Sequence, residues 1–433
     1  MPIKKNNFFN KKYRIIHYTL AFLIIRSAEY IFDYFFGDRN GKISHPIISP
    51  VLKVIYTLSI ILITLSFIDF IYLRMKNKYR SKFSPNKKKE TLLGLIILVT
   101  TTIIGLSIGE VVLRMQGEHP VQEGFNYDSE LGWVPDYTYL LPVNEKLDRV
   151  LFIGDSFTQP PNGYVKSYEN SHNDSCINKI QAITLGVAGY GTAQAYLMLK
   201  KHISYYKPKV VVLGFFVWND LADNLNDIYY SSSINNNRPA FEVNGDSLTQ
   251  VKTPSRWKYF LLNYFAIARA IWEYYINSNT EYLKPYTAFQ NQYKDFYTKN
   301  DTPRSKKAWG IAKKFVSLIR DESEKNNAKF LLIAFNNAFS VEKTVFDEEN
   351  KRCKGELSEI DPDKPLKIIT QFSLEKKLDF INITDVFKKD KEIHPTDTLY
   401  HQNLSGHFTG LAENIVGDTI HSYLKSRNFI KCN

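Results

Sequence analysis

A serine that follows a predicted strand is the first candidate for chemistry in this sequence. The apolar run at 149–153 leads directly into Gly154, Asp155 and Ser156. In a parallel α/β sheet, ligand crevices form at the carboxyl edge of the strands, where the start of a helix also favours negative charge. Ser156 could therefore act as a nucleophile, although a serine in this position is also typical of a helix N-cap.

Two later segments offer hydrogen-bond donors at the same predicted edge. Gly189 lies in a glycine-containing segment after the second predicted strand, where a backbone N–H can approach a substrate closely. Asn219 follows the third predicted strand, and a side-chain amide there can donate to a developing oxyanion, which is worth about 3 kcal/mol of barrier. Taken singly, Gly189 could serve a turn and Asn219 could cap a helix.

A histidine-containing segment near the C-terminus could supply a general base. We expect His401 to reach back to the serine as the base, with Asp397 holding its tautomer. His394 with Asp390 is the second-choice pair. His407 is interpreted as a packing or helix-start residue.

These four blocks, in order over residues 125–425, resemble the SGNH/GDSL hydrolase superfamily, and the lead-in at 127–133 is similar to that of membrane-anchored bacterial members. The resemblance implies a flavodoxin-like, three-layer α/β/α domain around a parallel sheet. It also implies Ser156 as nucleophile, His401 as base, and an oxyanion hole made by the backbone of Ser156 and Gly189 with the Asn219 side chain.

The sequence departs from the family pattern at two positions. Thr184 stands where many members have Asn, which we expect to affect local bracing more than chemistry. Asp397 stands four residues before His401, whereas the family's acid usually stands two or three residues before the histidine.

The pattern that would position these residues alternates short apolar runs with helical stretches from about residue 145, as is typical of a parallel α/β sheet. Strands are predicted at 149–153, 182–185, 210–216, 330–335 and 380–383, and helices at 192–206, 307–326, 365–377 and 405–425. An aromatic-rich insertion at 225–305 interrupts the alternation, with a predicted hairpin at Asn244–Gly245 and a helix at 257–275. It is interpreted as a cap packed on the core or at a membrane surface, or alternatively as an aromatic lid.

The N-terminal part is predicted to be a membrane anchor with two to three transmembrane helices, at about 15–36, 51–73 and 91–113. The first is the weakest, because Arg26, Glu29 and Asp33 interrupt it. Basic residues before the first span and at 74–90 predict that these segments are cytoplasmic. The organisation is thus an anchor at 1–114, a lead-in at 115–144 and an extracytoplasmic SGNH-like domain at 145–433 of a bacterial cytoplasmic-membrane protein.

Charge distribution argues against nucleic acid as a partner. The formal net charge of +12 arises within residues 1–114, which hold 18 Lys/Arg and 6 Asp/Glu, so residues 115–433 carry 38 of each. The larger part therefore lacks a basic footprint for phosphate backbones.

No metal or cofactor is expected. Cys176, Cys353 and Cys432 are far apart in sequence and form no zinc-type spacing, although one Cys176–Cys353 bridge remains open. Nucleotide-binding and HExxH motifs are absent from the sequence, as is the GxSxG motif of α/β-hydrolases.

The sequence thus predicts a membrane-anchored, extracytoplasmic serine esterase or O-acyltransferase that acts on ester groups of cell-envelope or exported glycans. Its expected partners are that acyl ester or glycan substrate and the lipid bilayer. The alternative is a catalytically inactive SGNH-like binding or assembly module at the membrane.

Overall fold

The computed structural model describes part of residues 102–114, and residues 125–135, 142–159, 163–225, 237–279 except 246, 294–352, 360–401 and 406–432. It divides into two compact units, one of residues 1–121 with 264–268 and one of residues 122–263 with 269–433. The second unit contains the central sheet and all of the residues that the sequence predicts to do chemistry.

A five-stranded parallel sheet forms the centre of the larger unit. Its strands are β4 (Ile180–Thr184), β3 (Asp148–Ile153), β5 (Val210–Phe216), β8 (Lys329–Phe335) and β9 (Asp379–Asn382), in that spatial order. Each neighbouring pair is parallel. The five strands were all predicted, with boundaries within two residues, and the parallel α/β class is confirmed.

The order of the strands has one functional consequence. Numbered along the chain, the sheet runs 2-1-3-4-5, which is the flavodoxin-like order. The order reverses between β3 and β5, and ligands in such sheets bind outside the carboxyl ends of the strands at that point. Ser156 follows β3 and Asn219 follows β5, so both lie at the switch point.

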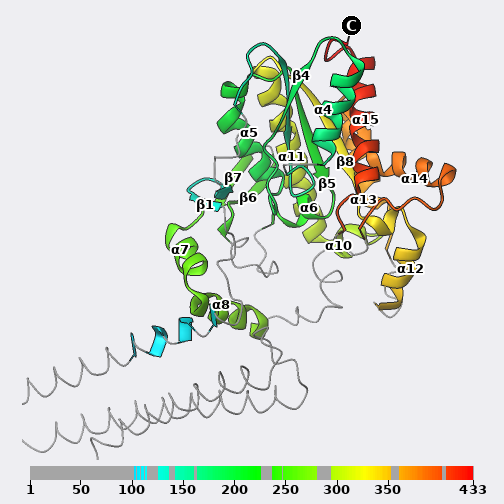
Figure 1. The fold of residues 1–433 in the computed structure, drawn as a ribbon. Helices are drawn as coiled ribbons and strands as arrows, with labels where there is room; N and C mark the ends of the chain where they lie inside the picture. Colours follow the sequence, from blue (N-terminus) through cyan, green and yellow to red (C-terminus); the bar gives the residue numbers. More distant parts are fainter. Residues whose placement is uncertain are drawn as a thin grey trace, which may run out of the picture. The chain divides into compact units, whose positions relative to one another are not determined.

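Helices cover the sheet in two pairs, which Figure 1 shows on its opposite sides. Helix α4 (Tyr164–Ser175) packs against α15 (Gly410–Ser426), and α5 (Thr192–Tyr206) packs against α11 (Pro303–Lys325). The shorter elements along the chain are α6 (Asn219–Ala222), α10 (Lys294–Tyr297), the 3-10 turn η4 (Ala338–Ser340), α12 (Lys343–Arg352), α13 (Lys364–Glu375) and α14 (Ile383–Ile393).

Three helix predictions need correction. Helix α11 begins at Pro303 and not at 307, because the Thr302 side chain caps it by accepting a hydrogen bond from the Ser305 N–H. Helix α15 begins at Gly410 and not at 405, because the Thr409 side chain caps it by accepting a hydrogen bond from the Ala412 N–H. The segment with His407 is therefore extended. The single helix predicted at 257–275 is two helices, α7 (Arg256–Tyr264) and α8 (Ala266–Asn279), which are separated at Phe265.

Two antiparallel hairpins flank the sheet. One joins β1 (Phe125–Asp128) to β2 (Gly132–Pro135), and the other joins β6 (Ala240–Asn244) to β7 (Ser247–Lys252), with Gly245 in the predicted turn at a φ of 60°. The Phe241 ring of β6 lies 4.9 Å from the Phe315 ring of α11. This part of the 225–305 insertion thus packs on the core.

The predicted spans at 15–36 and 51–73 lie outside the described residues, and the span at 91–113 is described only in part. Within the residues that are described, no helix combines the length and apolarity that crossing a bilayer requires. In the smaller unit, the Glu110 carboxylate accepts the N–H groups of Ala266 and Ile267, at 2.9 and 3.1 Å, at the start of α8. The membrane anchor stays a prediction.

One disulfide joins Cys176 to Cys432, with their Cα atoms 4.8 Å apart. The sequence left open a bridge from Cys176 to Cys353 instead. The partner differs because α15 runs beside α4 and brings the C-terminal segment to the end of α4, a proximity that cysteine spacing cannot reveal.

The contact between α4 and α15 is close at Gly417. A Cβ atom added there would lie 2.6 Å from the backbone nitrogen of Tyr168, so only glycine permits this approach of the two helices. One turn earlier, the Ser167 hydroxyl donates to the Asn414 side chain at 2.8 Å. The helix pair is thus held by a steric requirement and a polar contact.

Replacing Gly417 with Ala should therefore destabilise the protein. The added methyl group meets backbone and not a movable side chain, so we expect a loss of roughly 1–3 kcal/mol in the free energy of unfolding, measured by urea denaturation. Gly310→Ala is the matched control, because that helix position in α11 has open space around it and alanine should stabilise it by about 0.5–1 kcal/mol. Equal stability of Gly417→Ala and wild type would contradict the close helix contact.

Candidate active site

The site is defined by one contact between side chains that are far apart in sequence. The Nε2 atom of His407 lies 2.8 Å from the Oγ atom of Ser156, which is hydrogen-bond distance. A serine hydroxyl with an imidazole nitrogen at this distance is the arrangement of an activated nucleophile and its base.

A tight turn after β3 positions Ser156. The Thr158 N–H donates to the Asp155 carbonyl at 3.1 Å, and the Phe157 N–H donates to the Asp155 carboxylate at 3.0 Å. Gly154 enters the turn at a φ of 155°, where a Cβ atom would lie 2.4 Å from the Thr158 hydroxyl. The turn therefore explains the residues that precede Ser156: glycine permits the backbone conformation, and the Asp155 side chain accepts a hydrogen bond that closes the turn.

The second-strand loop is braced against this turn by Thr184. Its hydroxyl donates to the Thr158 carbonyl and accepts the Gly186 N–H, the latter at 3.2 Å. The position at which the sequence departs from the family pattern thus carries a local structural contact.

Aromatic packing positions His407. The next residue, Phe408, is buried and forms an antiparallel bridge with Tyr400. The Phe408 ring lies 4.8 to 5.2 Å from the rings of three other phenylalanines, Phe157, Phe335 and Phe387. The His407 ring itself lies 4.6 Å from the ring of Phe157, the residue after the serine, with the two planes tilted by 34°. The same aromatic cluster therefore fixes both partners of the contact.

The predicted base, His401, is not the histidine that contacts Ser156. The bridge folds the segment back on itself, so that the His401 N–H donates to the His407 carbonyl at 3.0 Å and His401 lies opposite His407. His407, which was interpreted from the sequence as a packing or helix-start residue, contacts the Ser156 hydroxyl instead. One feature of the sequence could have pointed to His407. The next residue, Phe408, is apolar and lies just before an amphipathic helix, so it was a candidate for burial.

The predicted acids lie elsewhere. Asp397 gathers with Asp390 and His394, and among the described residues its carboxylate contacts neither His401 nor His407. The second-choice pair does form, with His394 Nδ1 3.5 Å from the Asp390 carboxylate, but His394 is exposed and, among the described residues, neither side chain contacts Ser156. The short separation between Asp397 and His401 in the sequence did not predict a contact, because Asp397 lies at the end of α14.

The three predicted donors belong to the serine turn and to two loops that are tied to it. The Val187 N–H, two residues before Gly189, donates to the Gly154 carbonyl at 3.1 Å. In the part of the chain that the structure describes, neither the Ser156 N–H nor the Gly189 N–H donates to a protein acceptor. One N–H of the Asn219 amide donates to the Asp155 carboxylate at 3.1 Å, which ties the end of β5 to the turn after β3. Among the described residues the second N–H of that amide has no acceptor, so it can donate to a ligand.

Buried carboxyl groups support this edge of the sheet. Burial raises the pKa of Asp155 to about 7, although hydrogen bonds from Phe157 and Asn219 stabilise its charged form. Asp220 accepts from the Thr192 hydroxyl at 2.7 Å and from the Phe216 N–H at 2.9 Å, and burial raises its pKa too. These contacts connect the start of α5 with the end of β5.

The electrostatics of the two histidines favour a neutral base. Packing of the ring lowers the pKa of His407 below its usual value, and the nearby charge of His401 lowers it further. His401 in turn interacts with Glu413 in the first turn of α15, whose pKa burial raises. A neutral imidazole at Ser156 can accept the hydroxyl proton.

Two groups of side chains among the described residues could hold a metal ion. They are Asp390 with His394 and Asp397, and His172 with Cys176 and His421. Neither of these groups includes Ser156, His407 or Asn219.

Comparisons with known proteins add little to this site. No family model matches the chain, and no curated protein matches it. Among solved structures, a lipase/acylhydrolase from Enterococcus faecalis is similar over 65% of this chain and 97% of its own, with 13% identity and a TM-score of 0.35.

Two further similar structures have related descriptions. An acetylxylan esterase from Geobacillus stearothermophilus has 13% identity and a TM-score of 0.35, and covers 64% of this chain and 94% of its own. A GDSL-like lipase from Bacteroides thetaiotaomicron has 13% identity and a TM-score of 0.31, and covers 66% and 91%. Scores this low carry no argument about activity, so the function rests on the geometry of the site.

Replacing His401 with Gln should raise the pKa of His407, because it removes a positive charge beside that ring. The measurement is an NMR titration of the histidine ring signals, of which the protein has nine, with His407→Gln used for assignment. His394→Gln is the control, since it removes a histidine that belongs to another cluster. An unchanged His407 pKa in His401→Gln would show that the two rings are not electrostatically coupled.

Proposed function

We propose that this protein is a serine-dependent ester hydrolase, with Ser156 as the nucleophile and His407 as the general base. The observation that carries the proposal is the 2.8 Å contact between His407 Nε2 and Ser156 Oγ at the carboxyl edge of the sheet. The resemblance of the sequence blocks around Ser156, Gly189 and Asn219 to the SGNH/GDSL superfamily supports it.

In the proposed reaction, Ser156 Oγ attacks an ester carbonyl while His407 accepts the hydroxyl proton. The oxyanion of the tetrahedral intermediate is stabilised by the N–H groups of Ser156 and Gly189 and by the Asn219 amide. His407 then returns the proton to the departing alcohol, which leaves an acyl group on Ser156. A second nucleophile, activated by the same histidine, releases the acyl group and restores the serine.

The identity of the second nucleophile separates two activities. Water gives an esterase, and a sugar hydroxyl gives an O-acyltransferase. The predicted N-terminal spans place the domain outside a bacterial cytoplasmic membrane, so we propose ester groups of cell-envelope or exported glycans as substrates. This part of the proposal depends on the predicted topology and not on the site.

A catalytically silent binding module is the second candidate. The observation in its favour is that no carboxylate among the described residues contacts His407, whereas a base of this kind is usually oriented by one. In such a module, Ser156 and His407 would bind an acylated ligand without turning it over.

Labelling with a fluorophosphonate distinguishes the hydrolase from the silent module. It also tests whether His407 or His401 is the general base. Wild type should label at Ser156, Ser156→Ala should not label, and His407→Gln should label at least about 100-fold more slowly, because general-base assistance is lost. His401→Gln should keep most of the rate. All variants should be compared by thermal unfolding to exclude misfolding.

Two results would contradict these assignments. Folded wild type that takes up no label would favour the silent module. Loss of labelling in His401→Gln with retention in His407→Gln would restore the sequence-based choice of base.

Replacing Asn219 with Ala should lower kcat for hydrolysis of a small activated ester such as p-nitrophenyl acetate by about 10²–10³-fold, with a smaller effect on KM, because an oxyanion donor acts mainly in the transition state. Asn300→Ala, which removes an exposed amide just before α11, is the matched control and should leave kcat unchanged. A wild-type kcat in Asn219→Ala would remove Asn219 from the oxyanion hole.

A further inference from the structure

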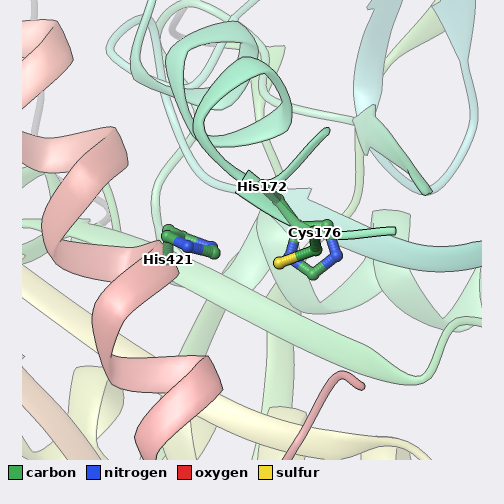
Figure 2. Close-up of side chains that lie close together, drawn as sticks. All are labelled: His172, Cys176 and His421. Atoms are coloured by element: carbon green, nitrogen blue, oxygen red, sulfur yellow. The ribbon is translucent and has the colours of Figure 1, made fainter. Parts of the chain in front are cut away.

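A cluster of sulfur and imidazole groups lies at the C-terminal end of α4. His172 is in the last turn of α4, Cys176 follows the helix, and His421 comes from α15, as Figure 2 shows. One potential ligand atom from each of the three lies within 4.8 Å of the other two. Cys176 Sγ is 3.8 Å from His172 Nδ1, and the two imidazole rings are 5.3 Å apart.

The fold brings these groups together by two simple rules. His172 and Cys176 are four residues apart, so they lie on the same side of the helix. His421 lies four residues, about one turn, after Gly417, where α15 lies close to the backbone of α4. Its ring is thereby directed at the end of α4, edge-on to the ring of His172.

The hydrogen bonds fix which nitrogen of His172 is available. Its Nε2 lies 2.9 Å from the Asn178 carbonyl oxygen, and a carbonyl can only accept, so Nε2 carries the hydrogen. Nδ1 therefore presents a lone pair towards the Cys176 sulfur. A ring N–H that donates to a carbonyl while the other nitrogen faces outward is the usual arrangement of a metal-binding histidine.

His421 supplies an independent observation. Its Nδ1 atom is buried and has no hydrogen-bond partner within the described residues. A buried polar atom without a partner usually indicates a missing ligand, water or ion.

Cys176 is joined to Cys432 by the disulfide, so its sulfur is not a thiolate in this state. Reduction by a dithiol would break the S–S bond, oxidise the reductant to its own disulfide and leave two thiols. Binding of a divalent cation to the Cys176 sulfur would then release that thiol's proton.

We propose that His172, His421 and Cys176 form a redox-controlled site for a thiophilic cation such as Zn²⁺, which becomes available when the Cys176–Cys432 bond is opened. Two imidazoles and one thiolate are a ligand set that zinc accepts, with a fourth position left open. The site is independent of the proposed ester hydrolysis. It lies at the opposite end of α4 from the serine turn, and a helix of 12 residues is about 18 Å long.

The decisive variant is Cys432→Ser, which frees the Cys176 thiol without any reductant. The full-length protein should carry Cys353→Ser as a common background, so that the third cysteine cannot contribute. Cys432→Ser should bind one equivalent of Zn²⁺ in competition with a chromophoric chelator. With Co²⁺ as the probe, it should show thiolate-to-metal charge-transfer absorption. The oxidised protein with both cysteines should do neither, and should gain both properties after reduction with dithiothreitol and its removal.

Ligand variants test the assignment in the Cys432→Ser background. His172→Ala, His421→Ala and Cys176→Ser should each weaken Zn²⁺ binding by at least about 100-fold, more than the loss of an outer hydrogen-bond partner costs. His394→Ala is the matched control, because it disrupts the other histidine-containing cluster and should retain the full equivalent.

Three outcomes would overturn the proposal. They are no Zn²⁺ binding by folded Cys432→Ser, retention of the equivalent in His421→Ala, and equal binding by the oxidised protein. Fluorophosphonate labelling of Ser156 should be the same in Cys432→Ser and its parent, so failure of the metal site and failure of the proposed hydrolase can be told apart.

Discussion

The parallel alignment of β3 and β5 is the constraint on which the rest of the molecule depends. Because both strands are buried and run in the same direction, their carboxyl ends meet at one edge, where the order of the sheet reverses. Ser156 and Asn219 leave the sheet there, and the Asp155 carboxylate bridges them through the Asn219 amide. The proposed nucleophile and the proposed oxyanion donor, which follow separate strands, are thus held near each other by backbone hydrogen bonds of the sheet.

The third component, His407, is held at this edge by hydrophobic packing and not by the hydrogen bonds of the sheet. It is carried by Phe408, whose ring is packed among other aromatic rings that include Phe157, the neighbour of the serine. Hydrophobic burial of large rings is non-directional, but close packing makes it geometrically specific. A polar contact at an exposed position is therefore maintained by an apolar cluster beneath it, and the energetic cost of ordering the segment is met by burial and not by the hydrogen bond itself.

Helices α4 and α15 connect the two sites of the molecule. They run side by side in the same direction. Gly163 at the start of α4 lies against Glu413 in the first turn of α15, and His172 meets His421 near the other ends. The first ends adjoin the segments that carry Ser156 and His407, and the far ends carry the sulfur and imidazole cluster. The close contact at Gly417 lies between these two ends, and the Cys176–Cys432 bond joins the chain beyond α15 to the end of α4.

The sequence by itself determined the parallel α/β class, the five strands, and the placing of Ser156 and Asn219 at one edge, because apolar periodicity and residue order report directly on strands and their ends. It could not predict that His407 and not His401 contacts Ser156, that Cys432 is the partner of Cys176, or that His172 lies beside His421. Each of those depends on a contact between segments far apart in the chain, or on a turn whose direction is set by what it packs against. The tertiary structure decided them because burial of Phe408 fixed the segment around the histidines, and the close approach at Gly417 fixed where the end of α15 meets the end of α4.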